Sequence, residues 1–308
     1  MNHSNTSVIL GFYAHPKTSL QATMLVRSLR QFGGGLANMP VWIFIREKTG
    51  FTPSQRNVLE SLDVQFFHFH IDEDMYRLPF AAKAVAAAEA EKLAEVRNNI
   101  LAWHDRTGLI CHAPWAFQLP EDISFGFRPT DIANIGAPFG QPLPPFWETI
   151  CDTFNLTAEQ LPAITTVIDQ VMLHLYINAG LLVVKPENKI LNRWAENLRK
   201  SYALPEFKRF YQEDQRYAIF MHQAALTAAV VQQTSPEERV ILPDDYLFSV
   251  DNFFDYPEEI RPQKLDDIVT GRFHEFFSLD DWEKMIHASP ELIGWFWSEL
   301  AAGPYWPI

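Results

Sequence analysis

The most constraining feature of this sequence is an alternation of short apolar runs with helix-forming segments in its amino-terminal part. Largely apolar runs occupy residues 8–12, 41–45 and 64–69. The runs at residues 8–12 and 41–45 are typical of strands that are covered on both faces of a sheet, and residues 64–69 are predicted to form the third strand. The intervals between them are long enough for helices, so two consecutive β-α-β units are predicted. In such a parallel sheet, ligands bind outside the carboxyl ends of the strands.

Capping signals predict where helices begin. Thr18 followed by Gln21 predicts one capping box, and the glycines from Gly33 predict the end of that helix. Thr52 and Gln55 form a second box, with a proline at the first helical position. Further along, the sequence predicts helices over residues 80–96 and 218–233, a helix after a cap formed by Thr157 and Gln160, and a helix that begins at Pro186. It also predicts strands over residues 99–103, 123–127, 181–184 and 239–242. One α/β domain is therefore expected.

The charge balance restricts the partners. The chain has 38 acidic and 25 basic residues, which give a formal net charge of −13. Duplex DNA or an anionic membrane surface would meet repulsion over most of the molecule. A small anion remains compatible, because local backbone N–H groups or a metal ion outweigh a distant field. We therefore expect no nucleic-acid partner, and nucleotides stay open.

Cysteine use and hydropathy predict the compartment. Cys111 and Cys151 are too few for a disulfide framework and lack paired metal-ligand spacing. The first apolar run is shorter than a signal-peptide core, and no stretch approaches the roughly 20 apolar residues that span a bilayer. The sequence predicts a soluble, cytoplasmic protein without a membrane span.

Several common active-site motifs are absent. The sequence has no Gly-x-Gly-x-x-Gly after a strand, no Gly-x-x-x-x-Gly-Lys-Ser/Thr and no Gly-x-Ser-x-Gly. These absences argue against a dehydrogenase, a P-loop kinase and an α/β-hydrolase.

An ordered set of short motifs remains between residues 8 and 277. The set comprises Tyr13-Ala14-His15, the helix from Lys83, Leu101-Ala102-Trp103-His104-Asp105-Arg106-Thr107, Asn178-Ala179-Gly180 before an apolar strand, Trp194, His222-Gln223 and His274. In order and spacing it resembles the nucleotide-diphospho-sugar transferases, which are glycosyltransferases of the GT-A fold, and in particular their family-8-like members. The resemblance implies a mainly parallel central sheet flanked by helices over residues 1–277. A small helical extension over residues 278–308 would pack on that domain.

The resemblance also implies a metal-binding Asp-x-Asp motif at the end of a strand. In the family its two carboxylates hold Mn²⁺ or Mg²⁺, and a late histidine often completes the metal shell. Such a cation stabilises the leaving nucleotide diphosphate. Here Asp105 matches the first carboxylate, Thr107 stands at the second, and His274 matches the histidine. The motif is degenerate, so we expect any Mn²⁺ or Mg²⁺ site to be weak and to need oxygens from the diphosphate.

The donor site that the resemblance implies extends over much of the chain. Its residues are Tyr13, His15, Lys83, Asp105, Arg106, Thr107, Asn178, Ala179, Gly180 and Gln223. Asp105 would hold metal or ribose, and Arg106 would contact phosphate oxygens. Asn178 and Gly180 would border the sugar, whose hydroxyls Gln223 would bind. His222 stands where the family has an aspartate, and no catalytic residue is assigned.

Structural explanations exist for the same residues. Asp105 and Arg106 could form a solvated surface pair, and Lys83 could be a solvated helix charge. Gly180 could simply ease the start of a strand. His274 lies among phenylalanines, a setting in which a histidine is commonly packed and hydrogen-bonded.

An aromatic tail ends the chain. The tail predicts a segment that covers the core, with a subunit contact as the alternative; its aromatic residues are Trp295, Phe296, Trp297, Tyr305 and Trp306.

The function expected first is transfer of a hexose from a nucleotide diphosphate sugar to an unknown acceptor. The alternatives are a non-catalytic nucleotide- or sugar-binding protein that has lost the second carboxylate, and an interaction protein that uses the tail. The oligomeric state stays open.

Overall fold

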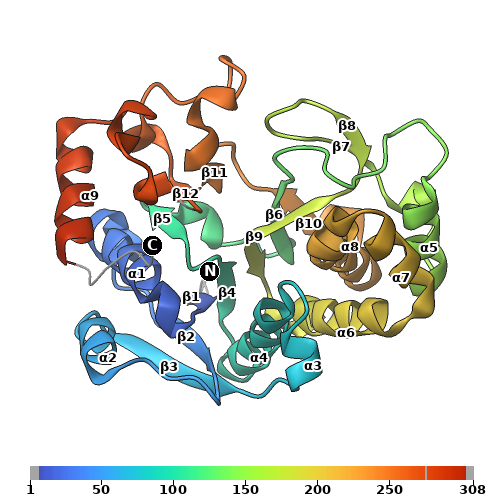
Figure 1. Cartoon of the computed structure of the whole chain (residues 1–308), viewed down its shortest axis with the longest axis horizontal. Helices are drawn as coiled ribbons and strands as arrows, with labels where there is room; N and C mark the ends of the chain where they lie inside the picture. The colour runs from blue at the N-terminus through green and yellow to red at the C-terminus, as the bar shows by residue number, and fades with distance from the viewer. Residues whose placement is uncertain (1–6, 275, 303–308) are drawn as a thin grey trace.

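A seven-stranded sheet forms the centre of the computed structural model, which describes residues 7–274 and 276–302 (Figure 1). Its strands, in spatial order, are β10 (Arg239–Ile241), β6 (Phe125–Pro129), β9 (Ile177–Val184), β4 (Ile100–His104), β1 (Val8–Tyr13), β2 (Val41–Arg46) and β3 (Val64–Phe69). Strand β9 is antiparallel to β4 and β6, and the other pairings in this sheet are parallel. The mainly parallel α/β sheet that the sequence predicted is confirmed.

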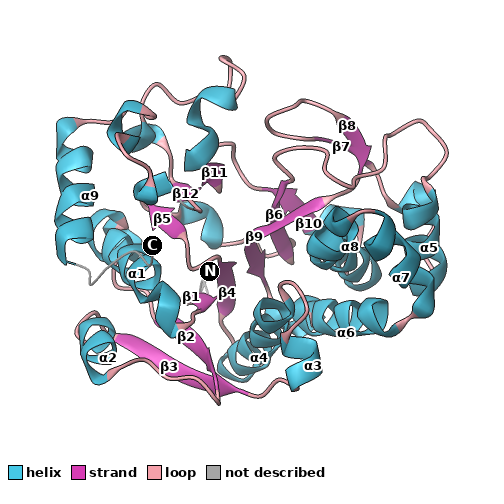
Figure 2. Ribbon diagram, viewed as in Figure 1, coloured by secondary structure: helices cyan, strands magenta, loops and turns pink. Residues whose placement is uncertain are grey.

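Helices cover both faces of this sheet (Figure 2). Helices α1 (Ser19–Phe32) and α2 (Pro53–Glu60) lie on one face, while α4 (Ala81–Arg97), α6 (Ile190–Ala203) and α8 (Gln215–Gln233) pack on the other. Successive residues of β1 alternate between the two sides: Ile9 belongs to the core under α4, and Leu10 to the core under α1. Burial on both faces is why the strand is a continuous apolar run.

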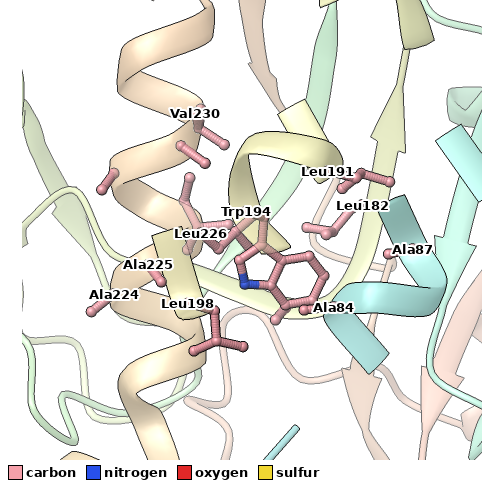
Figure 3. Packing of buried hydrophobic residues seen from close by; sticks show 14 of the residues in the cluster. Ala84, Ala87, Leu182, Leu191, Trp194, Leu198, Ala224, Ala225, Leu226 and Val230 are labelled. Carbon is pink, nitrogen blue, oxygen red and sulfur yellow. The ribbon is translucent and has the colours of Figure 1, made fainter. Parts of the chain in front are cut away.

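Trp194 marks the centre of the layer formed by α4, α6 and α8 (Figure 3). It is fully buried with Ala84 of α4, Leu182 of β9 and Leu226 of α8. The alanines of α4 allow this large ring to fit between the helices. Its Nε1 atom donates a hydrogen bond to the carbonyl oxygen of His222 at 2.8 Å, which ties α6 to α8.

The outer elements complete the layers. Helices α5 (Pro145–Phe154) and α7 (Pro205–Glu213) pack against α8, α3 (Glu73–Tyr76) precedes α4, and β7 (Ala163–Thr165) pairs with β8 (Met172–His174). A three-stranded sheet contains β11 (Phe248–Ser249), β12 (Thr270–Arg272) and β5 (Gly108–Ile110) in that order. Among the helices of the described residues, none is long and apolar enough to cross a membrane.

The last helix of the described residues packs beside α1 (Figure 1). Helix α9 (Pro290–Ala302) buries Phe296 against Phe277 and Trp282. It also forms an ion pair, in which Arg27 of α1 donates to Glu299 at 2.6 Å. The tail therefore covers apolar surface as far as residue 302. Tyr305 and Trp306, which the sequence grouped with it, lie outside the described residues.

Capping predictions had mixed outcomes. The box of Thr52 and Gln55 forms, with hydrogen bonds of 3.0 and 3.3 Å at the start of α2. The box predicted at Thr18 is wrong, because that hydroxyl instead donates to the carbonyl of His15 at 2.9 Å within a preceding 3-10 turn. The helix predicted after Thr157 is also wrong, since only a 3-10 turn forms (Ala158–Gln160). A proline at position 162 disfavours helical geometry just before it.

Candidate active site

A cavity of about 450 Å³ lies at the carboxyl ends of β4 and β6. Because β9 runs antiparallel to both, its amino end lies at the same edge of the sheet. The polar residues that line the cavity are Lys83 of α4, Asp105 after β4, Thr130 and Asp131 after β6, Asn134, Asn178 of β9, His222 and Gln223 of α8, Asn252, Asp255, Arg272 of β12 and His274. The topology thus gathers chemistry-bearing residues from distant parts of the chain.

Lys83 and Asp105 form an ion pair at this cavity. Lys83 is 6% exposed although it is a lysine, and its Nζ atom contacts the Asp105 carboxylate. The Asp105 backbone N–H donates to the carbonyl of Gly180 at 2.8 Å. Burial alone would raise the pKa of Asp105, but the Lys83 ammonium holds it below its usual value. Lys83 is therefore not a solvated helix charge, and it is the ion-pair partner of Asp105.

A second ion pair joins Arg272 to Asp131. The Nη1 atom of Arg272 also lies 2.8 Å from Nε2 of His274. A guanidinium can only donate, so this arrangement assigns His274 a neutral ring whose Nε2 accepts. Burial first, and then the Arg272 charge, lowers the pKa of His274, in agreement with that form. The His274 backbone N–H donates to Asp251 at 2.9 Å, which fixes the segment after β12.

Helix α8 contributes two adjacent side chains. The ring of His222 stacks on Phe80, with ring centroids 4.0 Å apart. Burial, followed by the charge of Lys83, lowers the pKa of His222 to about 3, so this ring is neutral at neutral pH. The Oε1 atom of Gln223 is buried and has no hydrogen-bond partner within the described part of the chain. A buried acceptor of this kind is usually satisfied by a ligand or water.

Gly180 is held in a tight packing position. Its N–H donates to Oδ1 of Asn178 at 3.0 Å. A Cβ atom at this position would lie 2.9 Å from Cδ1 of Leu247. Glycine is thus explained by close packing as well as by its position at the cavity.

A second cavity of about 970 Å³ adjoins the first, since His274 lines both. Arg106 and Thr107 line the second cavity, together with Lys17 and Thr18 before α1. The carboxyl-terminal segment also lines it, through Leu279, Asp280, Asp281, Trp282, Trp297 and Leu300. The carboxyl-terminal segment therefore borders this cavity directly.

The structure separates the predicted donor residues into three groups. Lys83, Asp105, Asn178, Ala179, Gly180 and Gln223 line the first cavity, while Arg106 and Thr107 line the second. Tyr13 and His15 line neither of these two cavities. The Tyr13 ring packs edge-on against Phe69, and Nδ1 of His15 accepts from the Lys17 backbone at 3.1 Å.

A family comparison identifies the chain. Residues 12–233 match the model of the Rhodobacterales glycosyltransferase domain, which is more than half of the sequence. The chain belongs to this glycosyltransferase family. A comparison of this chain with curated proteins found no match.

Solved structures share the fold of this chain. The galactosyltransferase LgtC, in complex with donor and acceptor sugar analogues, is 12% identical, with 92% of this chain and 98% of that chain covered and a TM-score of 0.50. The bifunctional glycosyltransferase WbbM is 12% identical over 91% of this chain and 48% of its own, with a TM-score of 0.53. Core-mannan synthase A from Aspergillus fumigatus, in a Mn/GDP form, is 8% identical, with 79% of this chain and 74% of that chain covered and a TM-score of 0.43. The glycosyltransferase has the GT-A fold that its sequence resembles.

The metal ligands that the resemblance implied do not fit a divalent cation in this glycosyltransferase. The Asp105 carboxylate contacts Lys83, and Nε2 of His274 accepts from Arg272. Thr107 lines the second cavity and supplies no charge. No group of three His, Cys, Asp or Glu side chains in residues 7–274 and 276–302 could hold a metal. A hard cation prefers several oxygen ligands, and here it would have to share the one implied carboxylate with the Lys83 ammonium and compete with Arg272 for Nε2 of His274.

Sequence reasoning missed Asp131 and Arg272. Asp131 had a usable signal, because it follows an apolar strand at the edge where ligands bind. The predicted strand ended at residue 127, two positions short of β6. Arg272 had no local signal, since its partner Asp131 lies 141 positions away in the sequence.

Proposed function

We propose that the glycosyltransferase moves a hexose from a nucleoside diphosphate sugar to an acceptor hydroxyl, with the donor bound across both cavities. The observation that carries the proposal is the adjoining pair of cavities that share His274. Small-molecule sites commonly have volumes of roughly 300–1,000 Å³. The cavity of about 450 Å³ suits the sugar, and the cavity of about 970 Å³ suits the nucleotide.

The sugar would meet neutral groups that both donate and accept. Asn178 and Gln223 line the smaller cavity, and an amide side chain can match the donors and acceptors of a sugar hydroxyl. Gln223 has a buried Oε1 that lacks a partner in the described chain, and a sugar hydroxyl would supply one. The backbone at Ala179 and Gly180 borders the same space. These contacts support the sugar-binding roles that the resemblance implied.

The nucleotide end would meet cationic groups. Arg106 lines the larger cavity, and its planar guanidinium can bind two phosphate oxygens at once. Its charge acts on both Tyr13 and His15, so these two residues lie within electrostatic range of it. Because they line neither cavity, this placement of the donor does not bring it into contact with Tyr13 or His15.

Transfer changes the charge of the donor. The bond between the anomeric carbon and the β-phosphate oxygen breaks, and its electron pair stays on that oxygen. The acceptor oxygen forms the new bond to the anomeric carbon, and its proton is released. The products are a glycoside, a nucleoside diphosphate and a proton. Cationic groups at the diphosphate favour this step, because they stabilise charge that develops as the bond breaks.

Thermal shift with a panel of uridine and guanosine diphosphate sugars tests the donor site. A ligand that binds the folded state should raise the melting temperature in step with its concentration relative to Kd. Gln223→Ala should raise the Kd of the nucleotide sugar that shifts the melting temperature by about tenfold, the effect expected for loss of a hydrogen bond at a buried site. Gln118→Ala, at an exposed position away from both cavities, is the matched control. If no nucleotide sugar shifts the melt at millimolar concentration, the donor site is wrong.

A non-catalytic binding protein is the second candidate, and Thr107 in place of a carboxylate is the observation in its favour. Family membership favours the transferase. Release of nucleoside diphosphate from the donor that binds, measured with and without a mixture of sugar acceptors, separates the two. Tight binding without release would support the non-catalytic alternative.

A further inference from the structure

We infer that protein cations, above all Arg272, take the place of a divalent metal ion at the donor diphosphate, so that the donor binds without metal. The inference rests on the proposed function, because it concerns the charge around the same donor. It departs from the Mn²⁺ or Mg²⁺ site that the sequence resemblance implied.

Arg272 is a preorganised cation at the wall of the first cavity. Its side chain is 15% exposed, and two groups from different segments hold it: the Asp131 carboxylate after β6 and the Nε2 atom of His274. These contacts fix the plane of the guanidinium while it lines the cavity. A fixed guanidinium matches phosphate geometry, since its N–H groups form a rigid fork. His274 lines both cavities, so Arg272 lies near their junction.

Two further cations act at the same place. Lys83 lines the first cavity, and an ammonium has three donors, so its pairing with Asp105 leaves others for a ligand. Arg106 lines the second cavity. Lys83 and Arg272 line the first cavity together with His274, and His274 also lines the second cavity with Arg106. A diphosphate that passes from one cavity to the other would meet all three.

A divalent ion would compete with this arrangement. To bind both Asp105 and His274 it would have to share the Asp105 carboxylate with the Lys83 ammonium and take the Nε2 lone pair of His274 that now accepts from Arg272. Both cations would then lie beside a double positive charge in a partly desolvated site. Arg106 would supply positive charge at the leaving diphosphate, and Lys83 and Arg272, each paired with a carboxylate, would contribute their remaining N–H donors.

Calorimetry on the full chain tests this inference, with uridine diphosphate and guanosine diphosphate as probes. Each is titrated in buffer with EDTA and again with Mn²⁺. We expect the nucleotide that binds to have the same Kd in both buffers within about threefold, because coupling to the metal should be weak. Arg272→Gln should weaken binding in EDTA by about tenfold or more, the effect of losing a hydrogen bond to a charged group. Arg193→Gln, which breaks an exposed ion pair on α6, should bind like the native protein.

Arg272→Gln leaves the Asp131 carboxylate without its cation, so stability must be controlled. The double variant Arg272→Gln with Asp131→Asn removes both charges, and its melting curve shows whether it is folded. A folded double variant that binds nucleotide as tightly as native protein in EDTA would overturn the role of Arg272. Binding that needs Mn²⁺ would overturn metal independence and leave the donor site standing. Absence of binding in both buffers would reject the donor site itself, and this inference with it.

Discussion

The Lys83 ammonium contacts the Asp105 carboxylate and so joins the Ala-rich helix α4 to the end of strand β4. Both groups line the first cavity, and the Asp105 backbone is held in turn by the carbonyl of Gly180 at 2.8 Å. The pair therefore links helix, sheet and cavity at one point. Removal of one partner leaves the other charge with little water around it.

Lys83→Met should lower the free energy of unfolding by up to about 3 kcal/mol, because it leaves Asp105 without its cation. Lys83→Met combined with Asp105→Asn should recover much of that loss, since no unpaired charge remains. Urea denaturation of both variants measures the difference. A double variant as unstable as Lys83→Met alone would show that packing, and not charge, determines the effect.

Two buried histidines should make stability depend on pH. Burial lowers the pKa of His104 to about 4 and that of His222 to about 3. Both folded-state values lie below the usual 6.5, so between these values the unfolded chain binds more protons and stability falls as pH falls. Between pH 7.5 and 5 each histidine should cost about 2 kcal/mol. Burial raises the pKa of Glu91 to about 7, so Glu91 makes the protein more stable as pH falls. This contribution is present in the native chain and in each histidine variant.

The histidine contribution can be isolated by substitution. His222→Gln should reduce the loss of stability between pH 7.5 and 5 by about 2 kcal/mol. Gln118→Ala, at an exposed position, removes no titratable group and should leave the pH dependence unchanged. Equal slopes for His222→Gln and the native chain would show that His222 is protonated alike in both states.

Gly180→Ala should destabilise the protein through Leu247. The added Cβ would lie 2.9 Å from the Leu247 side chain, closer than ordinary packing allows. We expect a loss of about 1–3 kcal/mol, the usual cost of overpacking. In a Leu247→Ala background the same substitution should cost less, and a double-mutant cycle by urea denaturation measures this coupling. Strict additivity would mean that Leu247 does not limit the site.

Helix α9 should contribute to stability through Phe296. This ring is fully buried between Phe277 and Trp282, so Phe296→Ala should cost about 3–5 kcal/mol. Trp297→Ala, at a side chain that is 50% exposed, should cost much less.

Deletion after Ser289 should also lower the melting temperature. A truncated chain that melts like the full chain, but loses an oligomer in light scattering, would favour a subunit contact instead.

Burial on both faces leaves a local mark in the inner strands of the central sheet, whereas the edge strands β3 and β10 are only partly buried. Continuous apolar runs around β1, β2 and β9 are visible without any tertiary information. The short strands β11 and β12 had no such pattern, since each has only two or three residues. The same limit applies to the cavity. Lys83 and Asp105 stood out by motif, whereas the pairing of Arg272 with Asp131 depends on contacts between distant segments.

The two cavities take their lining from both ends of the sequence: Lys17 and Lys83 are early, while Arg272, His274 and Leu300 are late. On the ribosome, α4 and β4 emerge long before β12 and α9 have been synthesised. A nascent chain can therefore pair Lys83 with Asp105 while Asp131 still lacks its guanidinium. A donor that contacts Arg272, as proposed above, could bind only after residue 272 has been synthesised, so it could not assist the earlier folding of the segment that holds Lys83 and Asp105.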